Sequence, residues 1–191
     1  MARVADPVEE FRRWLEEARE AGVSVPEAMT LATADGGGRP SARMLLLKGV
    51  DERGFSFFTG YDSRKGQELE ANPRGALVFY WQPLGRQVRI EGTVRRLPAE
   101  ESDAYWATRP PRSRAAAAAS HQSEVIEDRD GLDAEFERLL PGDEVPRPER
   151  WGGYVLEPDT IELWQHRDDR LHDRYRFTRA REGWRVERLA P

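Results

Sequence analysis

The sequence predicts an α+β protein, mainly antiparallel β, whose strands form a closed or half-closed barrel with peripheral helices. Short apolar runs follow one another along the chain and are separated by turn residues, as in antiparallel sheets. Helical segments lie between these runs without the regular strand–helix alternation that a doubly wound nucleotide fold requires. With 191 residues and no repeat or linker, we expect one domain over residues 1–191.

An N-terminal helix region is predicted over residues 1–21, with the helix beginning after Asp6. An Asp side chain accepts hydrogen bonds from the first free backbone N–H groups of a helix, and Pro7 suits the first turn. Apolar residues then recur at helical spacing from Val8 to Ala18. Three further helices are expected over residues 63–70, 99–108 and 130–140.

Strands are predicted where apolar or alternating runs lie between turn residues. Residues 29–34 and 42–50 flank the turn-rich segment 35–40, which predicts a hairpin. Residues 76–81 are nearly all apolar, and this favours a strand buried on both faces. The remaining strands are expected over residues 55–59, 87–97, 154–156, 160–164, 171–177 and 184–189.

Composition excludes several classes of protein. The formal net charge of −5 argues against a nucleic-acid binder, and the lack of cysteine removes disulfides, zinc–thiolate sites and thiol nucleophiles. No apolar run approaches the roughly 18 residues of a membrane span, and the N-terminus has no signal-peptide pattern. We therefore expect a cytoplasmic protein without membrane contact. The 30 basic residues include only two lysines, Lys48 and Lys65.

Common catalytic and nucleotide-binding motifs are absent. Neither G-x-G-x-x-G after a strand nor G-x-x-x-x-G-K-[ST] occurs. The three histidines, His121, His166 and His172, lack metal-ligand spacing, so no metal site is predicted. A hydrolase triad built on His172 and Asp173 would lack the G-x-S-x-G turn that exposes the nucleophile.

Two segments place cations where anions bind in other proteins. Arg43 and Lys48 bracket an apolar run, and on one strand residues five apart point to opposite faces, toward ligands or toward solvent. Ser63 is expected to cap a helix that continues with Arg64 and Lys65. Cations at a helix start oppose the macrodipole, whereas a bound phosphate would use the free N–H groups there. The alternative is an exposed Arg–Lys pair.

Tyr105, Arg109 and Ser113 recur every fourth residue. If the helix reaches Arg109, the first two side chains share a face before the prolines turn the chain. A guanidinium flanked by hydroxyls suits phosphate, because Arg binds phosphate as a fork and hydroxyls complete the shell. The alternative is the exposed end of a surface helix.

Near the C-terminus, Arg170, His172 and Arg174 alternate along a predicted strand. On such a strand the three side chains lie on one face. Neighbouring cations repel one another unless an anion or an electron-rich ring lies against them. This segment is therefore the most site-like part of the sequence, and a solvated face is the alternative.

Ten short segments together carry a family pattern. They are Ala32-Thr33, Arg43-Met-Leu-Leu-Leu-Lys48, Phe57-Phe-Thr59, Ser63-Arg-Lys-Gly66, Arg86-Gln-Val88, Tyr105…Arg109-Pro110…Ser113, Ser120-His-Gln-Ser123, Trp151-Gly-Gly153, Trp164-Gln165 and Arg170-Leu-His-Asp-Arg174. In this order and spacing the sequence resembles the pyridoxine/pyridoxamine 5′-phosphate oxidase family over nearly the whole chain. The resemblance implies an FMN-binding split β-barrel and a homodimer. It also implies FMN at the subunit interface, with the strands of residues 151–191 completing the site.

The resemblance also implies roles for individual residues. The substrate phosphate would be held by Lys48, Tyr105, Arg109 and Ser113. Arg170 and His172 would bind the pyridine end of the substrate and act as the catalytic residues, by orienting the reacting C4′ carbon and assisting proton movement. The implied FMN contacts are Arg43, Met44, Leu45, Leu46, Lys48, Phe58, Thr59, Arg64, Lys65, Gln87, Gln122, Ser123, Trp164 and Arg174.

The implied reaction oxidises a phosphorylated B6 vitamer, pyridoxamine or pyridoxine 5′-phosphate, to pyridoxal 5′-phosphate. Hydride passes to FMN, and dioxygen then reoxidises the flavin and yields hydrogen peroxide. The alternatives are a phenazine-biosynthesis type FMN oxidase of an unphosphorylated ring, or a flavin- or pyridoxal-phosphate-binding protein without turnover.

Three departures from the family pattern stand out. The family usually has a longer N-terminal arm that closes over the substrate, whereas six residues precede the first helix here, so we expect looser closure. His166-Arg167 replaces a usual Gly and adds bulk beside the flavin-facing strand. Phe58 stands where a Tyr is frequent and so lacks one hydroxyl.

Overall fold

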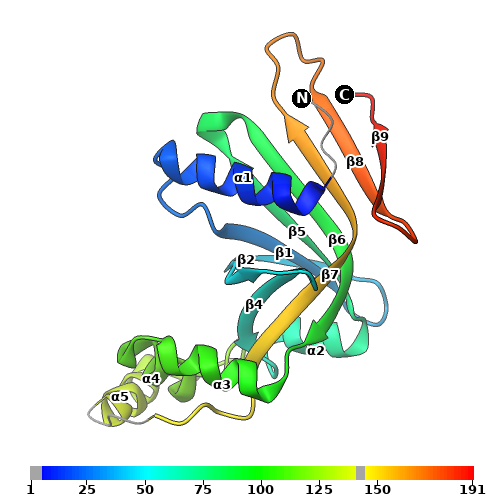
Figure 1. The fold of residues 1–191 in the computed structure, drawn as a ribbon. Helices are drawn as coiled ribbons and strands as arrows, with labels where there is room; N and C mark the ends of the chain where they lie inside the picture. The colour runs from blue at the N-terminus through cyan, green and yellow to red at the C-terminus, as the bar shows by residue number, and fades with distance from the viewer. Residues whose placement is uncertain (1–5, 141–144) are drawn as a thin grey trace.

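The structure, a computed structural model, describes residues 6–140 and 145–191. Within them the strands form one curled antiparallel sheet of order β2-β1-β5-β6-β7-β4-β3, with β8 paired to β7 and β9 to β8 (Figure 1). The half-barrel predicted from the sequence is thereby confirmed. The strands are β1 (Ala28–Ala34), β2 (Pro40–Leu46), β3 (Gly49–Val50), β4 (Phe55–Gly60), β5 (Arg74–Trp81), β6 (Arg86–Arg96), β7 (Trp151–Gln165), β8 (Asp173–Arg179) and β9 (Trp184–Arg188).

Helices lie around the periphery of the sheet. They are α1 (Pro7–Glu20), α2 (Arg64–Ala71), α3 (Ala99–Thr108), α4 (Pro111–Ala119) and α5 (Arg129–Leu139). The capping predictions are confirmed, because the Asp6 side chain accepts a hydrogen bond from the Val8 N–H, and Ser63 accepts one from the Gly66 N–H. No described helix has both the length and the apolar character needed to span a membrane.

Helix α1 packs its apolar face against the sheet and closes the main core. The ring of Phe11 lies 5.0 Å from Phe55 and 4.9 Å from Phe79, both edge-on, and all three side chains are fully buried. Trp14 and Ala18 extend the same buried face. The spacing read from the sequence therefore matches the stripe that α1 buries.

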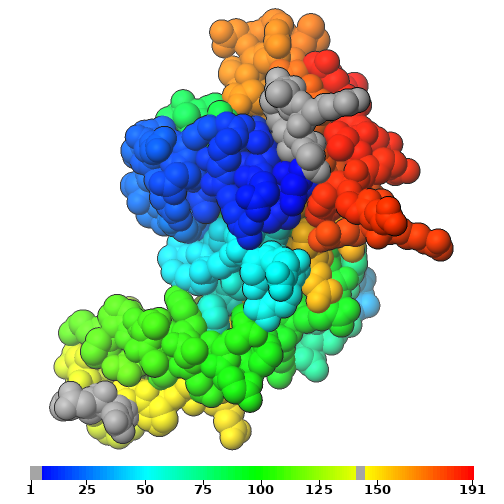
Figure 2. Space-filling view, viewed as in Figure 1, coloured from blue at the N-terminus to red at the C-terminus, as the bar shows by residue number. Residues whose placement is uncertain are grey.

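A second apolar cluster lies beneath α3 and α4. Trp106, Val145 and Trp151 form its buried centre, and Phe58 and Tyr105 pack against them. Figure 2 shows α3–α5 as a lobe that extends from the body of the molecule, away from the β8–β9 end. The two ends are joined by β7, which pairs with β4 over residues 151–156 and with β8 over residues 160–165.

Segment 42–50, expected as one strand, is divided between two pairings. After β2 ends at Leu46, the Leu47 N–H donates to the Glu27 carbonyl at 2.9 Å. The next N–H, that of Lys48, donates to the Ser56 carbonyl at 2.8 Å, so the chain passes from β1 to β4. The single-strand prediction was wrong, and Lys48 lies in the crossover rather than on a strand with Arg43.

Two other strand predictions need correction. Segments 154–156 and 160–164 belong to one strand, β7, which continues through a bulge where the pairing with β6 shifts between Glu91 and Gly92. A Cβ at Gly92 would lie 1.9 Å from the Glu157 carbonyl oxygen, so this close approach requires glycine. Strand β5 is buried on one face only: Phe79 is fully buried, whereas Tyr80 is 57% exposed because no layer of the protomer covers it.

Candidate active site

Four residues predicted to hold a phosphate line one open cavity. Lys48 comes from the β2–β3 crossover, Tyr105 from α3, Arg109 from the α3–α4 junction, and Ser113 from the first turn of α4. Helix α3 ends at Thr108, so Arg109 is extended rather than helical, yet it lines the same cavity as Tyr105. The cavity measures about 440 Å³, and its other lining residues are Met44, Leu45, Leu46, Phe58 and Pro110.

Arg109 is a half-buried cation without a carboxylate partner among the described residues. Its guanidinium lies 4.5 Å from the ring centre of Trp151 and 5.3 Å from that of Trp106. One terminal nitrogen donates to the Ser113 carbonyl at 2.8 Å, and the buried Nε has no partner. Burial lowers the pKa of Arg109. A desolvated guanidinium with unused donors is a receptor for an anion.

Stacked aromatic rings form the wall behind Arg109. The Phe58 and Tyr105 rings are stacked with centroids 3.9 Å apart, and Trp151 lies 5.7 Å from Phe58. Such a wall suits a flat heteroaromatic ligand, because ring faces attract one another in offset stacks. Phe58 keeps this role in the wall without the hydroxyl that a Tyr would add.

A second cavity of about 470 Å³ adjoins the first and is lined by two residues that bind a buried lysine. The two cavities share Leu45, Phe58, Arg109 and Ser113, and the second also touches Thr59 and Gln122. Lys65, on α2, is 4% exposed. Its Nζ donates to Thr59 Oγ1 (2.9 Å), Ser63 Oγ (2.8 Å) and Gln122 Oε1 (2.7 Å).

The partners of the Lys65 ammonium are all uncharged. Burial, together with the nearby charge of Arg43, lowers the pKa of Lys65 to about 8. Of the exposed Arg–Lys pair considered from the sequence, only Arg64 is exposed. The three N–H donors of this ammonium already have acceptors, so Lys65 offers a bound anion mainly a buried positive charge, and among the described residues no carboxylate lies within hydrogen-bond distance of it. In that respect these residues fit the phosphate of FMN.

A second group of predicted residues lies together on β6, β7 and β8 and in the loop before β8. Gln87 pairs with Trp164, which pairs with Arg174 on the next strand. The His172 ring lies 4.6 Å from Trp164, and the Arg174 Nε donates to Glu162 Oε1 at 2.8 Å. Five of the predicted side chains, including Arg170 in the adjoining loop, thus gather at the β8 end of the sheet.

The prediction that Arg170, His172 and Arg174 alternate on one strand face was wrong. Strand β8 begins at Asp173, and Arg170 has a left-handed backbone, with φ of 62°. A local turn prevents strand pairing there, because the Arg170 N–H donates to the Arg167 carbonyl at 3.1 Å. His172 Nδ1 accepts from the Arg167 N–H at 3.1 Å, so the neutral ring carries its proton on Nε2.

The two groups of predicted residues lie at opposite ends of the protomer. Arg109 and Ser113 lie at the α3–α4 end, whereas His172 and Arg174 lie at the β8 end (Figure 1). Gln122 and Ser123 follow α4, and Ser123, with φ of 78°, is exposed. Within one copy of the chain these two groups of predicted residues therefore do not meet.

Comparison with known proteins identifies the family. Residues 15–141 match the family described as pyridoxamine 5′-phosphate oxidase, and residues 151–191 match the pyridoxine 5′-phosphate oxidase C-terminal dimerisation region. The chain belongs to the pyridoxamine 5′-phosphate oxidase family. This family of oxidoreductases was the one that the sequence motifs resembled, so that interpretation is confirmed.

Individual family members cover the chain almost completely. Pyridoxine/pyridoxamine 5′-phosphate oxidase from Rubrobacter xylanophilus is 57% identical over 97% of this chain and 87% of its own length. The enzyme of the same name from Salinibacter ruber is 53% identical over 97% of this chain and 89% of its own.

Two solved structures share the fold. PhzG from Burkholderia lata, solved with tetrahydrophenazine-1-carboxylic acid, superposes with a TM-score of 0.96 at 38% identity, covering 100% of this chain and 95% of PhzG. A pyridoxamine 5′-phosphate oxidase-related, FMN-binding protein from Nostoc punctiforme has a TM-score of 0.78 at 18% identity, with 96% of each chain covered. The latter shows the shared fold alone.

Sequence reasoning missed several residues that contact the predicted site residues. Glu68 and Glu162 are buried carboxylates that bind predicted cofactor arginines, and Trp106 supports Arg109. The spacing of four between Arg64 and Glu68 on a helix was an available signal for one of these pairs. The spacing of three between Trp106 and Arg109 at the end of α3 was another. The Arg43–Glu68 and Arg174–Glu162 pairs join separate elements, so no local pattern indicates them.

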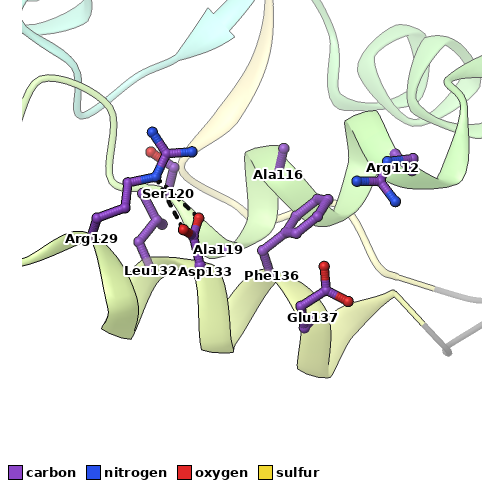
Figure 3. Close-up of a pocket in the computed structure, with 9 residues that line it drawn as sticks. All are labelled: Arg112, Ala116, Ala119, Ser120, Arg129, Leu132, Asp133, Phe136 and Glu137. Carbon is purple, nitrogen blue, oxygen red and sulfur yellow. Dashed lines mark hydrogen bonds and ion pairs between the residues drawn. The ribbon is translucent and has the colours of Figure 1, made fainter.

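A third cavity lies elsewhere. It measures about 560 Å³ between α4 and α5 and contains none of the predicted site residues. Figure 3 shows Phe136 facing Ala116 across it, and Arg129 paired with Asp133 along α5. Its arginines have partners of their own, since Arg112 stacks over the Phe136 ring at 5.0 Å. Within the described ranges no group of three or more His, Asp or Glu side chains is arranged to hold a metal ion.

Proposed function

We propose that this chain is an FMN-dependent oxidase that converts pyridoxamine 5′-phosphate, pyridoxine 5′-phosphate or both to pyridoxal 5′-phosphate, with dioxygen reduced to hydrogen peroxide. Family membership and relatives above 50% identity support the oxidoreductase class. The observation that carries the substrate is the unneutralised Arg109 guanidinium beside Lys48, Tyr105 and Ser113 in one cavity. The two tryptophan rings and the Ser113 carbonyl compensate part of the cost of burying that charge, and an anionic ligand would neutralise it.

The proposal gives each cation group one phosphate. Arg109 and Lys48 bind the substrate phosphate, with the Tyr105 and Ser113 hydroxyls completing its shell. Lys65 attracts the phosphate of FMN through its charge, and its Nζ exchanges one of its bonds to Thr59, Ser63 or Gln122 for a bond to a phosphate oxygen. The aromatic wall that includes Phe58 lies between these groups and excludes water from the flat rings.

FMN, when bound, supplies the hydride acceptor that is subsequently reoxidised by dioxygen. The protein's own residues supply orientation and proton transfer. The His172 Nε2–H is directed by the hydrogen bond that the Arg167 N–H makes to Nδ1, so it can donate to a substrate oxygen or nitrogen. The alcohol loses a hydride and a proton directly, whereas the amine gives an imine that water hydrolyses with release of ammonia.

A homodimer supplies both halves of each site in this proposal. The dimerisation region covers residues 151–191, which include Trp164, His172 and Arg174. The exposed Tyr80 and Met44, 57% and 63% accessible, leave apolar surface that a second copy would cover. The α3–α4 end of one copy then faces the β8 end of the other.

The second candidate is an FMN oxidase of an unphosphorylated ring. The 38% identical PhzG structure, which holds a tetrahydrophenazine, favours it. Such a substrate carries a carboxylate but no phosphate, so Arg109 and Lys48 would meet one negative charge instead of a phosphate dianion, which is why we rank it second. A flavin-binding protein without turnover is the third reading.

The test is an aerobic assay of the purified protein with each phosphorylated vitamer. We expect a yellow protein that forms pyridoxal 5′-phosphate and hydrogen peroxide in equal amounts. A yellow protein that consumes no oxygen with either vitamer would favour the binding protein. Turnover of a dihydrophenazine carboxylate alone would favour the second candidate, and a colourless protein that FMN does not reconstitute would contradict all three.

A further inference from the structure

A buried carboxylate lies behind the proposed phosphate site of FMN. Glu68, on α2, is 6% exposed. Its Oε2 accepts hydrogen bonds from Thr33 on β1 and from Ser41 and Arg43 on β2, the last two at 2.6 and 3.1 Å. Its Oε1 accepts from the Arg64 Nε at 2.9 Å. One side chain therefore joins the start of α2 to two strands of the sheet.

This carboxylate balances a cluster of cations. Arg43, Arg64 and Lys65 lie together, and the charge of Arg43 contributes to the lowered pKa of Lys65. Burial acts to raise the pKa of Glu68, but hydrogen bonds from Ser41, Thr33 and the two arginines together lower it to about 2. Glu68 is therefore ionised at every pH at which the protein would work.

The two arginines use their donors differently. Arg43 directs both terminal nitrogens to protein acceptors, which are Leu31, Thr33, Ser41 and Glu68. It therefore contributes mainly a fixed positive charge. Arg64 binds Glu68 through Nε alone, and its terminal nitrogens, which form the planar fork that suits phosphate, have no partner among the described residues.

We propose that Glu68 is a positioning residue of the cofactor site, one that holds the Arg64 fork and the Arg43 charge beside Lys65 for the phosphate of FMN. This inference rests on the proposed function, since it requires FMN to be the ligand. Glu68 makes no favourable contact with the phosphate itself, because an ionised carboxylate has no proton to donate and repels an anion. It acts through the arginines.

The direction in which FMN affinity changes when Glu68 is neutralised separates a positioning role from a purely electrostatic one. Removing a negative charge near a phosphate strengthens the attraction between the site and the dianion if nothing moves. Removing the anchor of Arg64 instead frees a long side chain that must be ordered again on binding. Positioning therefore predicts weaker FMN binding in a neutral variant, and simple charge removal predicts tighter binding.

The experiment titrates apo-protein with FMN and, separately, with riboflavin, which lacks the phosphate, and follows quenching of flavin fluorescence. For Glu68→Gln we expect the Kd for FMN to rise about tenfold, as for the loss of one charge-assisted hydrogen bond, while the Kd for riboflavin stays unchanged. Glu70→Gln is the matched control, because Glu70 lies on the same helix but pairs with Arg96 at the surface. That control should match the wild type with both flavins.

Two further variants extend the test, and the first of them also serves if Glu68→Gln folds poorly. Glu68→Asp keeps the charge but shortens the reach to Arg64, and it should weaken FMN in the same direction. In an Arg64→Met background, Glu68→Gln should lose most of its effect on FMN, since its route of action is gone.

Unchanged or tighter FMN binding by Glu68→Gln would overturn the inference, and so would an equal loss of FMN and riboflavin affinity. A wild-type protein that binds FMN no better than riboflavin would overturn the proposed cofactor site together with the role of Glu68. A weakened FMN site in Glu68→Gln with the wild-type preference for FMN intact would leave the proposed function standing and refute only the positioning role.

Discussion

Arg109 offers the sharpest single perturbation, because function and stability should respond to it in opposite ways. Arg109→Met keeps a long apolar side chain against Trp151 but removes the buried charge. The variant loses the bonds that Arg109 would make to a substrate phosphate. Charge-assisted hydrogen bonds are worth about 1.5–3 kcal/mol, which corresponds to a fall of about 10- to 150-fold in kcat/KM.

Stability should not fall with activity. The guanidinium is half-buried, has no carboxylate partner among the described residues, and leaves its Nε unbonded. Replacing a half-buried charge that no carboxylate balances by a side chain of similar volume removes a desolvation cost, and this gain offsets the lost contacts with the tryptophan rings and the Ser113 carbonyl. We therefore expect the free energy of unfolding of the apo-protein to stay within about 1 kcal/mol of the wild type or to rise.

The assay measures pyridoxal 5′-phosphate formation under air, and urea unfolding of the apo-protein gives its stability. Unphosphorylated pyridoxine is the control substrate, and its kcat/KM should be the same in variant and wild type. The reasoning is refuted if kcat/KM for the phosphorylated vitamer is unchanged. It is equally refuted if the free energy of unfolding drops by more than about 2 kcal/mol, since Arg109 would then be structural.

Three other predictions follow from the same geometry. The pKa of Lys65 is lowered to about 8, so in the apo-protein this side chain loses its charge as the pH rises through that value, and the Kd for FMN should rise above pH 8. The Lys65→Met variant should bind FMN more weakly, with a Kd that does not change between pH 7 and 9.5. His172→Ala and Arg170→Ala should reduce kcat strongly, while the amount of FMN bound per protomer stays near the wild-type value. Loss of the flavin in either variant would contradict the proposal that these two residues contact the substrate. Coexpressed Arg109→Met and His172→Ala chains should recover about a quarter of wild-type activity, because random pairing makes about half of the dimers heterodimers and each heterodimer has one intact site of its two. If no activity is recovered, both residues act within one protomer.

Local chemistry made much of the fold predictable from sequence. Asp6 and Ser63 were identified as helix caps because capping depends on residues within one turn, and the structure confirms both. The helix over 99–108 is likewise confirmed as α3, since the following prolines end it. The split of segment 42–50 was not predictable, because it depends on Glu27 and Ser56, which pair with it from other strands.

The candidate site was predictable in composition but not in arrangement. Motif order placed Tyr105, Arg109 and Ser113 in one site, and the structure brings them to one cavity. Local sequence does not report that Lys65 is buried while its neighbour Arg64 is exposed, because that depends on how α2 docks on the sheet. The turn that keeps His172 off β8 arises from hydrogen bonds within residues 165–172, which a strand periodicity overlooks.

Local patterns also could not predict that the residues at the α3–α4 end lie far from those at the β8 end. Trp164 and Phe58 both belong to the resemblance, yet they lie toward opposite ends of β7 and its neighbours. Only the course of the 15-residue strand β7 shows that one copy cannot bring them together. Whether one copy or two copies of the chain bring these residues together therefore follows from the three-dimensional arrangement and not from the motifs.

The central claim is that this chain recognises the phosphate of its substrate, and one ratio tests it most directly. The measurement is kcat/KM for pyridoxine 5′-phosphate divided by kcat/KM for pyridoxine, with FMN-saturated enzyme under air. With Arg109 and Lys48 both bound to the phosphate, we predict a ratio of about 100 or more. A ratio near 1, with oxygen consumed equally on both compounds, would contradict the account.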